Sequence, residues 1–379
     1  MKDPARRPTV CFVAPSLAGG GAERVAVQVL NALDPERWNR CLYLFERRGP
    51  YLADVSPTIR VDAGDAVSRV GQWRELRRFL RARRPDVVVV FLSYFSVLTA
   101  ARAAGISARV VFDVETPVSA FLGDAEYRWS RPWMRRLFTG VMRRACGAAD
   151  LLRATSNGVA DDLVRTYGAS PSRVCVVPNP VDVTAIAKDA EEPLDAAIDA
   201  NWTRPVIVAA GRLADVKNYP LLIDALAILR ETIPASLFIL GTGEHEAAIR
   251  SAIRDRALDG VVHLCGFQRN PWKFMARADV FALTSRYEGF GNVLVEAMAC
   301  GVPVVATSSP GTRDIVSDGV DGVLVEAHAP AAVAAALAVV LSDAVRRQRM
   351  AVAARRKADT YRTETVVGAY DRALAGALA

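Results

Sequence analysis

The sequence predicts an α/β protein built from two doubly wound domains, each a parallel sheet with helices on both faces. Short apolar segments rich in Val, Ile, Leu and Phe alternate with amphipathic segments throughout the 379 residues. This alternation is typical of parallel strands that are buried on both faces. The chain also exceeds the roughly 250 to 300 residues at which a single hydrophobic core stops growing. Two domains are therefore expected.

The first half of the chain contains apolar segments that we interpret as buried strands, with helices following several of them. The apolar segments are residues 9–15, 40–46, 86–92, 108–114, 149–156 and 173–182. A helix begins near Ala22, after the first of these segments, and further helices follow residues 92 and 156. The order strand, helix, strand is that of a doubly wound sheet.

An acidic stretch with two prolines, residues 188–205, separates this first cycle from a second one. The second set of strand-like segments is 205–213, 235–243, 260–267, 279–285, 303–308 and 322–325. Such a break in composition marks a domain boundary near residue 180. We expect residues 1–180 to form one domain, joined by a C-terminal helix of about residues 360–379 that crosses back. Residues 181–359 form the other domain, which faces the first across a cleft.

Cysteine usage and hydropathy exclude several classes of protein. The six cysteines are scattered singly and only three histidines occur, so neither a disulfide framework nor a Cys/His metal site is indicated. The first 22 residues resemble a signal peptide in charge and hydropathy, but Pro15 and an amphipathic continuation favour strand, loop and helix. The longest uncharged run, residues 87–101, is shorter than the roughly 18 to 20 residues of a spanning helix. We therefore expect a cytoplasmic protein.

Positive charge is concentrated in the first half of the chain. Residues 1–180 carry 27 Lys and Arg against 17 Asp and Glu, whereas residues 181–379 carry 21 against 24. The asymmetry indicates an anionic partner, for which nucleic acid, a membrane surface and a phosphorylated substrate are candidates. No strand platform with interleaved aromatic residues, as nucleic-acid binding requires, is visible. Nucleic acid is not expected as a partner.

One basic amphipathic segment lies within this half. At helical spacing Trp133 and Phe138 fall on one side, and Arg135, Arg136 and Arg143 fall on the other. Such a helix could lie against an anionic membrane at its cytoplasmic face, as a peripheral contact. It could equally pack its apolar side on the core and expose a solvated basic side. The sequence leaves both interpretations open.

The segment 286–307 has the strongest chemical signal. Glu288 follows an apolar strand, the turn "EGFGN" is compact because of Gly289 and Gly291, and a helix then carries Glu296 about one turn in. A helix N-terminus at the carboxyl end of a parallel strand favours a phosphate group, since its backbone N–H groups and its dipole both attract anions. A pyrophosphate with carboxylates beside it to accept sugar hydroxyls is a consistent ligand.

This spacing, Glu, seven residues, Glu, resembles the hallmark of glycosyltransferase family 4, whose members are retaining enzymes of GT-B architecture. The resemblance implies that Glu288 contacts the transferred sugar and that Glu296 holds the ribose of the nucleotide. It extends to "AGRLADVKN", where Arg212 and Lys217 match the residues that bind the diphosphate, and to "GTGE", "VHLCGF" and residues 310–325. The donor-binding residues that we expect are Gly20, Gly21, Arg212, Lys217, Gly243, Phe267, Gly289, Phe290, Gly291, Asn292, Val293 and Glu296.

The acceptor side departs from the family, which often carries a His in a segment like "WxHTP". Here the chain has "FDVETP", with Asp113 and Glu115 as the available carboxylates. Either could take a proton or orient an acceptor hydroxyl. The alternatives are that Asp113 caps a strand end and Glu115 lies on a solvated loop. We list Glu288, Glu115 and Asp113 as candidate catalytic residues.

The chain lacks an Asp-x-Asp triplet, so binding of a divalent metal is not indicated. Arg212, Lys217 and the helix N-terminus would replace the metal, and we expect neither metal nor cofactor, the nucleotide-sugar being a substrate. The glycines at 19–21 fit the first two positions of G-x-G-x-x-G, but Arg24 occupies the third. The resemblance implies instead that Gly20 and Gly21 approach the donor.

The sequence as a whole predicts a metal-independent, retaining hexosyltransferase. Its donor is a nucleotide-sugar, with UDP expected from the resemblance alone, and its acceptor is a glycan or a polyprenyl-linked glycan. Such a reaction belongs to the biosynthesis of cell-envelope polysaccharides or glycoconjugates. The alternatives are a nucleotide-sugar epimerase or hydrolase of the same fold, and an inactive basic protein that binds membranes or nucleic acid.

Overall fold

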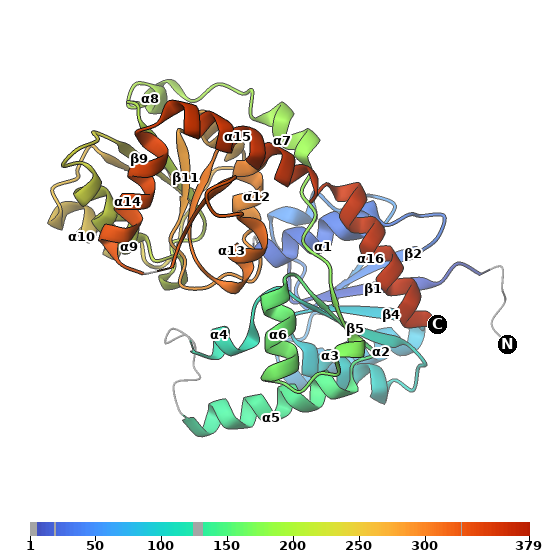
Figure 1. The fold of residues 1–379 in the computed structure, drawn as a ribbon. Helices are drawn as coiled ribbons and strands as arrows, with labels where there is room; N and C mark the ends of the chain where they lie inside the picture. Colours follow the sequence, from blue (N-terminus) through green and yellow to red (C-terminus); the bar gives the residue numbers. More distant parts are fainter. Residues whose placement is uncertain (1–5, 19, 124–131, 327) are drawn as a thin grey trace. The chain divides into compact units, whose positions relative to one another are not determined.

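The computed structural model describes residues 6–18, 20–123, 132–326 and 328–379. The chain divides into two compact units (Figure 1). The first consists of Met1–Pro180 together with Thr363–Ala379, and the second of Val181–Arg362. The first unit is therefore discontinuous in the sequence, because its last helix follows the whole of the second unit.

The first unit is built on a parallel sheet in which seven strands occur among the described residues. Their spatial order is β3-β2-β1-β4-β5-β6-β7. The strands are β1 (Thr9–Ala14), β2 (Asn39–Leu44), β3 (Arg60–Ala63), β4 (Val87–Phe91), β5 (Arg109–Val114), β6 (Leu151–Ala154) and β7 (Val174–Val176). The sequence did not predict β3, a short edge strand that contains Arg60 and Asp62.

Helices cover both faces of this sheet. Alternate residues of each strand point to opposite faces, and apolar residues on both faces are buried beneath helices. In β1, Cys11 and Val13 face one core, whereas Val10 and Phe12 face the other. On the first side pack α2 (Arg69–Arg83), α3 (Tyr94–Ala103), α5 (Pro132–Ala148) and α6 (Asn157–Arg165). On the second side α1 (Gly21–Ala32) and α16 (Thr363–Leu378) lie next to each other (Figure 1). The short α4 (Val118–Gly123) follows β5.

The C-terminal helix α16 is held firmly in the first unit. Val366, Tyr370 and Leu374 are buried in the same core as Phe12. Asp371 accepts a hydrogen bond of 2.5 Å from the indole Nε1 of Trp38, and it forms an ion pair with Arg37. These contacts make residues 363–378 an integral layer of the unit.

The second unit contains a parallel sheet of six strands among the described residues, in the order β10-β9-β8-β11-β12-β13. The strands are β8 (Val206–Ala210), β9 (Ser236–Leu240), β10 (Val262–Leu264), β11 (Val280–Leu283), β12 (Val304–Thr307) and β13 (Gly322–Val325). The order reverses between β8 and β11, and open α/β sheets bind ligands at the carboxyl ends of strands at such a point.

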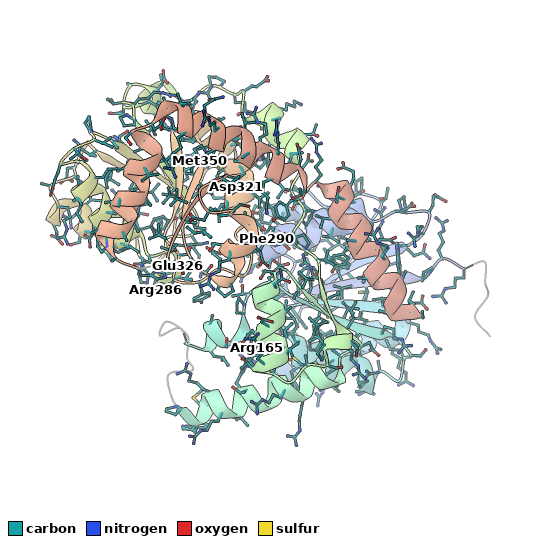
Figure 2. The ribbon with its side chains drawn as sticks, viewed as in Figure 1. Arg165, Arg286, Phe290, Asp321, Glu326 and Met350 are labelled. Carbon is teal, nitrogen blue, oxygen red and sulfur yellow. The ribbon has the colours of Figure 1, made fainter. Side chains whose placement is uncertain are left out.

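Helices also cover both faces of this second sheet. One side is covered by α9 (Tyr219–Leu229), α10 (Glu246–Asp255) and α14 (Pro330–Leu341). Met350, labelled in Figure 2, belongs to the core on this side. The other side carries α7 (Val183–Asp189), α11 (Trp272–Met275), α12 (Asn292–Ala299), α13 (Pro310–Ile315) and α15 (Ala344–Asp359). The short α8 (Ala196–Asp199) precedes β8. The predicted class, two doubly wound parallel-sheet domains, is confirmed.

Candidate active site

The loops at the carboxyl edge of the second sheet approach one another closely because they carry glycine. Gly211 follows β8 and Gly241 follows β9, and both have a positive φ. A Cβ atom on Gly241 would lie 2.1 Å from the carbonyl oxygen of Gly211. In the next turn, a Cβ on Gly243 would lie 2.4 Å from the carbonyl oxygen of Leu213. Gly243 therefore serves first to pack the "GTGE" segment against the loop after β8.

A second close approach joins the loop after β11 to the start of α13. A Cβ on Gly311 would lie 2.6 Å from the carbonyl group of Gly289, and the backbone N–H of Gly311 donates to the carbonyl oxygen of Glu288. Gly291, with φ +99°, is the N-cap of α12 and contributes no side-chain cap. Asn292 and Val293 form the half-buried first turn of this helix. Glu288 thus lies in the turn that leads directly into α12.

Lys217 and Glu288 meet at this edge. Lys217 ends a short 3₁₀ turn, η3 (Asp215–Lys217), and its Nζ lies 2.6 Å from Oε1 of Glu288. The hydroxyl of Ser285 donates to the same carboxylate oxygen at 2.6 Å. Both charged side chains are largely buried. An ion pair with an additional hydrogen bond lowers the cost of burying the two charges.

The neighbouring strand fixes the position of Ser285, which in turn holds the carboxylate of Glu288. Ser285 is buried, and its carbonyl oxygen accepts a hydrogen bond of 2.7 Å from the hydroxyl of Thr307 at the end of β12. The sequence did not single out Ser285 or Thr307. Each of these two residues is a polar residue at the end of a buried strand. Such strand ends meet at one edge of a parallel sheet, so this position could have indicated that the two residues belong to the site.

Glu296, the second glutamate of the pair, lies on α12 and is only 1% exposed. Its Oε2 accepts a hydrogen bond of 3.0 Å from the indole Nε1 of Trp272. Trp272 begins α11, and its backbone N–H donates to the side chain of Asn270. The sequence did not indicate Trp272 as a partner of Glu296. A buried carboxylate requires a hydrogen-bond donor, and the indole N–H of tryptophan is such a donor.

The other predicted donor-binding residues occupy different environments. Arg212 is exposed on the loop after β8, and Phe267 is 65% exposed on the loop after β10. Phe290 (labelled in Figure 2), in contrast, is buried. Its ring packs edge-on against Tyr361, with ring centroids 5.3 Å apart. Its side chain belongs to the core, so only its backbone is available to a ligand. His263, in β10, stacks on Phe238.

The glycine-rich loop of the first unit leads into α1. Gly20 is the N-cap of that helix and Gly21 its first residue, and both are exposed. Gly19 lies outside the described residues. The structure therefore places the last two glycines at a helix N-terminus at the carboxyl end of β1, as the sequence indicated.

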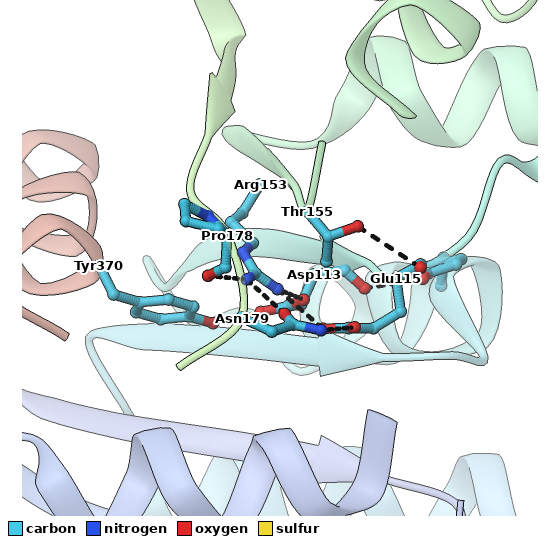
Figure 3. A network of polar contacts seen from close by, with 8 residues as sticks. Asp113, Glu115, Arg153, Thr155, Pro178, Asn179 and Tyr370 are labelled. Carbon is cyan, nitrogen blue, oxygen red and sulfur yellow. Dashed lines mark hydrogen bonds and ion pairs between the residues drawn. The ribbon is translucent and has the colours of Figure 1, made fainter. Parts of the chain in front are cut away.

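Asp113 and Glu115 belong to a buried polar network in the first unit (Figure 3). Asp113 ends the apolar part of β5, and Arg153 is its direct neighbour in β6. One guanidinium nitrogen of Arg153 lies 2.6 Å from Oδ1 of Asp113 and 2.8 Å from Oε1 of Glu115. The hydroxyl of Tyr370 donates to the other oxygen of Asp113 at 2.6 Å. Asp113 is fully buried.

Glu115 differs from Asp113 in that its side chain remains 11% exposed. Its Oε2 accepts a hydrogen bond of 2.7 Å from the amide of Asn179. Burial raises the pKa of Glu115 to about 8, and the Asp113 charge adds to this, whereas Arg153 and Asn179 oppose it. The solvated-loop interpretation of Glu115 is therefore wrong, because the residue is a partly exposed member of a buried network.

Helix α5 carries the basic amphipathic segment, and the structure divides it into two halves. Met142 and Cys146 in its second half are buried against the sheet. In the first half Trp133 is 60% and Leu137 64% exposed, and Phe138 is only partly buried. Arg135, Arg136 and Arg143 are exposed. The helix is thus neither wholly a core helix nor wholly detached from the core.

The described part of the chain contains neither a cluster of metal ligands nor a helix suited to crossing a bilayer. Within residues 6–18, 20–123, 132–326 and 328–379, no three His, Cys, Asp or Glu side chains lie together so as to hold a metal ion. None of the helices in this part of the chain combines the length and the apolar character that crossing a bilayer requires.

The fold is shared with solved glycosyltransferases of the GT-B class. The structure of Anabaena HepE in complex with UDP-glucose superposes with a TM-score of 0.81 at 20% identity, covering 97% of this chain and 99% of that one. Sucrose-phosphate synthase from Thermosynechococcus elongatus gives a TM-score of 0.79 at 18% identity, with coverages of 98% and 100%. The two parallel-sheet units are therefore those of a GT-B protein.

The sequence comparisons identify the family. Residues 19–185 match "Glycosyltransferase Family 4" and residues 191–357 match "Glycosyl transferases group 1". Together the two matches cover most of the chain, which belongs to glycosyltransferase family 4. The family resemblance drawn from Glu288 and Glu296 is confirmed.

Curated relatives match over part of their length. An N-acetylgalactosamine-N,N'-diacetylbacillosaminyl-diphospho-undecaprenol 4-alpha-N-acetylgalactosaminyltransferase of Campylobacter jejuni is 37% identical over 179 residues, 47% of each chain. A D-inositol 3-phosphate glycosyltransferase of Xylanimonas cellulosilytica is 37% identical over 229 residues, 55% of this chain and 52% of the relative. The chain spans about half the length of these relatives.

Proposed function

We propose that this protein is a retaining glycosyltransferase that moves a hexosyl group from a nucleotide-sugar to a hydroxyl group of a glycan or lipid-linked glycan. A UDP-sugar is the donor that we expect, because HepE was solved with UDP-glucose. The observation that carries the proposal is the Lys217–Glu288 ion pair beside the N-terminus of α12. It combines a cation, a carboxylate and an anion-binding helix end at the ligand-binding edge of the sheet.

The two residues of the ion pair are the groups that would bind the nucleotide-sugar. A diphosphate at the N-terminus of α12 offers the ammonium of Lys217 a more highly charged partner than one carboxylate. Arg212, on the exposed loop after β8, adds a second cation. The transfer of Lys217 to the diphosphate would release Glu288, still held by Ser285 at 2.6 Å, to accept a hydroxyl of the donor sugar. The two residues would thus exchange partners when the donor binds.

Glu296 would accept the ribose hydroxyls, with Trp272 holding its carboxylate in orientation. Because Glu296 is 1% exposed, ribose binding requires the side chains that cover it to move. Phe267, exposed on the loop after β10, would contact the nucleotide base, and the backbone of Phe290 and Gly289 would line the sugar.

Transfer with retention would proceed on one face of the sugar, with the departing phosphate assisting the incoming hydroxyl. Lys217, Arg212 and the helix N-terminus would stabilise the charge that develops on the nucleoside diphosphate, which is the task of preorganised electrostatic groups. We therefore propose a reaction without a metal ion and without an enzymic nucleophile. Glu288 would also stabilise positive charge on the sugar.

On the acceptor side we assign the role of orienting the hydroxyl to Glu115. Its carboxyl group is partly exposed, whereas Asp113 is fully buried. With a pKa of about 8, Glu115 can exchange a proton with a bound hydroxyl group near neutral pH. Asp113 has a structural role in this assignment. Gly20 and Gly21 would let the backbone approach the donor.

We further propose that the protein acts at the cytoplasmic face of a membrane, in the biosynthesis of cell-envelope polysaccharide or glycoconjugate. The exposed apolar side chains of Trp133 and Leu137 alternate with Arg135 and Arg136 in α5. Such a helix suits an anionic interface. The Campylobacter relative is named for a diphospho-undecaprenol substrate, which supports a lipid-linked acceptor.

A donor panel tests the proposal. The protein is incubated with UDP-, GDP- and ADP-sugars, with and without a prenyl-diphospho-N-acetylhexosamine in detergent, and nucleotide release and product are measured. Acceptor-dependent release of one nucleotide, with an α-linked product from an α-linked donor, is the expected result. Turnover of the donor without an acceptor would indicate a hydrolase or epimerase. Release of none of the nucleotides would indicate a binding protein.

A further inference from the structure

The buried network of the first unit joins three parts of the chain that are distant in the sequence. Asp113 and Arg153 come from the adjacent strands β5 and β6. Asn179 comes from the segment by which the chain leaves this unit at Pro180, and Tyr370 from α16, by which it returns. Figure 3 shows these side chains converging on the Arg153 guanidinium and the two carboxyl groups. Glu115 is the charged member that retains solvent exposure.

Hydrogen-bond chemistry fixes the orientation of the Asn179 amide. One nitrogen of Arg153 donates to the carbonyl oxygen of Pro178 at 2.6 Å and to Oδ1 of Asn179 at 2.7 Å. Arginine has only donors, so the amide oxygen must face it. The amide nitrogen then faces Oε2 of Glu115, to which it donates at 2.7 Å. In the reversed orientation the amide nitrogen would face the Arg153 donor and the amide oxygen would face Oε2 of Glu115, so neither hydrogen bond could form.

We propose that Asn179 is a positioning residue for Glu115, and that the segment leaving the first unit thereby sets the orientation of the acceptor-side carboxylate. The inference rests on the proposed role of Glu115 in acceptor binding. Glu115 is held at both oxygens, by Arg153 on Oε1 and by Asn179 on Oε2. Removal of the Asn179 amide takes the donor away from Oε2, so the carboxylate can rotate about its bond to Arg153.

The backbone around Asn179 supports this role. Asn179 is buried and lies between two prolines, Pro178 and Pro180, whose rings restrict the backbone of the segment. Arg153 holds Pro178 and Asn179 through the same nitrogen, so the side chain and the main chain of the segment are fixed together. A shift of this segment would therefore be transmitted to Glu115 through one hydrogen bond.

The charged and titratable groups around Glu115 make its ionisation a sensitive probe of this geometry. They are Asp113 from β5, Arg153 from β6, Tyr94 from α3 and Tyr370 from α16. The Asn179 hydrogen bond favours the ionised form of Glu115 and lowers its pKa. The loss of this bond should move the titration of Glu115 to higher pH.

Matched variants test the proposal in the full chain. Asn179→Ala removes the amide, and Asn179→Asp keeps an oxygen for Arg153 but removes the donor to Glu115. Tyr94→Phe is the control, because the Tyr94 hydroxyl donates to the backbone oxygen of Asp113 at 2.7 Å and touches no carboxylate. The first readout is the ¹³C NMR titration of the Glu115 carboxyl carbon, assigned by the signal that Glu115→Gln removes. It requires neither donor nor acceptor.

Both Asn179 variants should titrate Glu115 at higher pH than the wild-type protein, whereas Tyr94→Phe should leave the midpoint unchanged. The second readout is kcat and KM for a prenyl-diphospho-N-acetylhexosamine acceptor with a UDP-sugar. Misorientation of the carboxylate should lower kcat by about tenfold or more in both Asn179 variants, with the KM of the donor unchanged. An unchanged Glu115 titration in both Asn179 variants would overturn the proposal.

Failure of the proposed function would look different. If Glu115→Gln transfers sugar at the wild-type rate, Glu115 has no acceptor role, whatever the NMR titration shows. If Glu115→Gln loses transfer but the Asn179 variants behave like Tyr94→Phe in both readouts, the function stands and the positioning role of Asn179 is refuted.

Discussion

The ammonium group of Lys217 lies 2.6 Å from the carboxylate of Glu288, although the two residues are 71 positions apart in the sequence. Each residue neutralises the other in a largely buried setting, and each is assigned to a different part of the donor. On the proposed function, a diphosphate would attract Lys217 and a sugar hydroxyl would bind Glu288, so donor binding would separate the pair. This relationship gives the first two predictions.

Lys217→Ala should lower turnover at least about a hundredfold, since removal of one preorganised electrostatic donor typically costs that much or more. It also leaves Glu288 without its cation, so binding of the nucleotide diphosphate should weaken. Steady-state kinetics and calorimetric titration with UDP measure the two effects, and circular dichroism should show an intact fold. Lys188→Ala, which removes an exposed lysine of α7, is the control. Near-normal turnover in Lys217→Ala would refute the site.

Glu288→Gln should abolish most turnover while retaining UDP binding. The amide oxygen can still accept hydrogen bonds from Ser285 and Lys217, so the local structure is preserved. What is lost is the negative charge beside the sugar. Equal losses in UDP affinity and in turnover would contradict the assignment of Glu288 to the sugar and of Lys217 to the diphosphate.

Trp272→Phe should raise the KM for the donor and lower stability by about 1 to 3 kcal/mol, because it removes the indole hydrogen bond to buried Glu296. Trp202→Phe is a matched control in the same unit, since the Trp202 indole nitrogen has no hydrogen-bond partner among the described residues. Urea unfolding and donor kinetics distinguish the two. If both variants change KM alike, Trp272 acts only through packing.

Tyr370→Phe should destabilise the first unit by about 1 to 3 kcal/mol, because an oxygen of the fully buried Asp113 loses its hydroxyl donor. Tyr167→Phe is the comparison, as the buried hydroxyl of Tyr167 lacks a hydrogen-bond partner in the part of the chain that the structure describes. Urea midpoints give the difference. Equal midpoints for the two variants would show that the Tyr370 hydrogen bond contributes nothing.

A double substitution, Trp133→Ser with Leu137→Ser, should weaken binding to vesicles of anionic phospholipid, as measured by co-sedimentation. The two side chains are exposed apolar residues of α5. The matched control is Val345→Ser with Val352→Ser, which removes two exposed apolar side chains of α15 in the second unit. Unchanged sedimentation of the α5 variant would exclude this helix as the membrane contact.

The sequence predicted the parts of the fold that depend on periodicity. Apolar runs such as residues 86–92 and 279–285 are long enough to identify buried strands, and β4 and β11 lie within them. The edge strand β3 was missed because a strand of four residues with Arg60 and Asp62 has no apolar pattern. An edge strand is less buried than a central strand, so burial requires fewer apolar residues in its sequence.

The site was predictable where a motif fixes residues close together, and unpredictable where strands and loops bring distant residues into contact. The turn around Glu288 could be read from its glycines, whereas Trp272 and Ser285 become partners of Glu296 and Glu288 only through the sheet. The pairing of Asp113 with Arg153 did leave a signal. Arg153 is the one charge in β6, and Asp113 follows an apolar run in β5, and buried charges require partners.

The return of α16 to the first unit has a consequence for synthesis on the ribosome. Tyr370, which bonds to Asp113, and Asp371, which bonds to Trp38, are made only after the whole second unit. Until then the face of the sheet around Phe12 lacks one of its covering helices. The half of the protein that is translated first is therefore completed last, and a nascent chain would need to keep that apolar face from aggregating in the meantime.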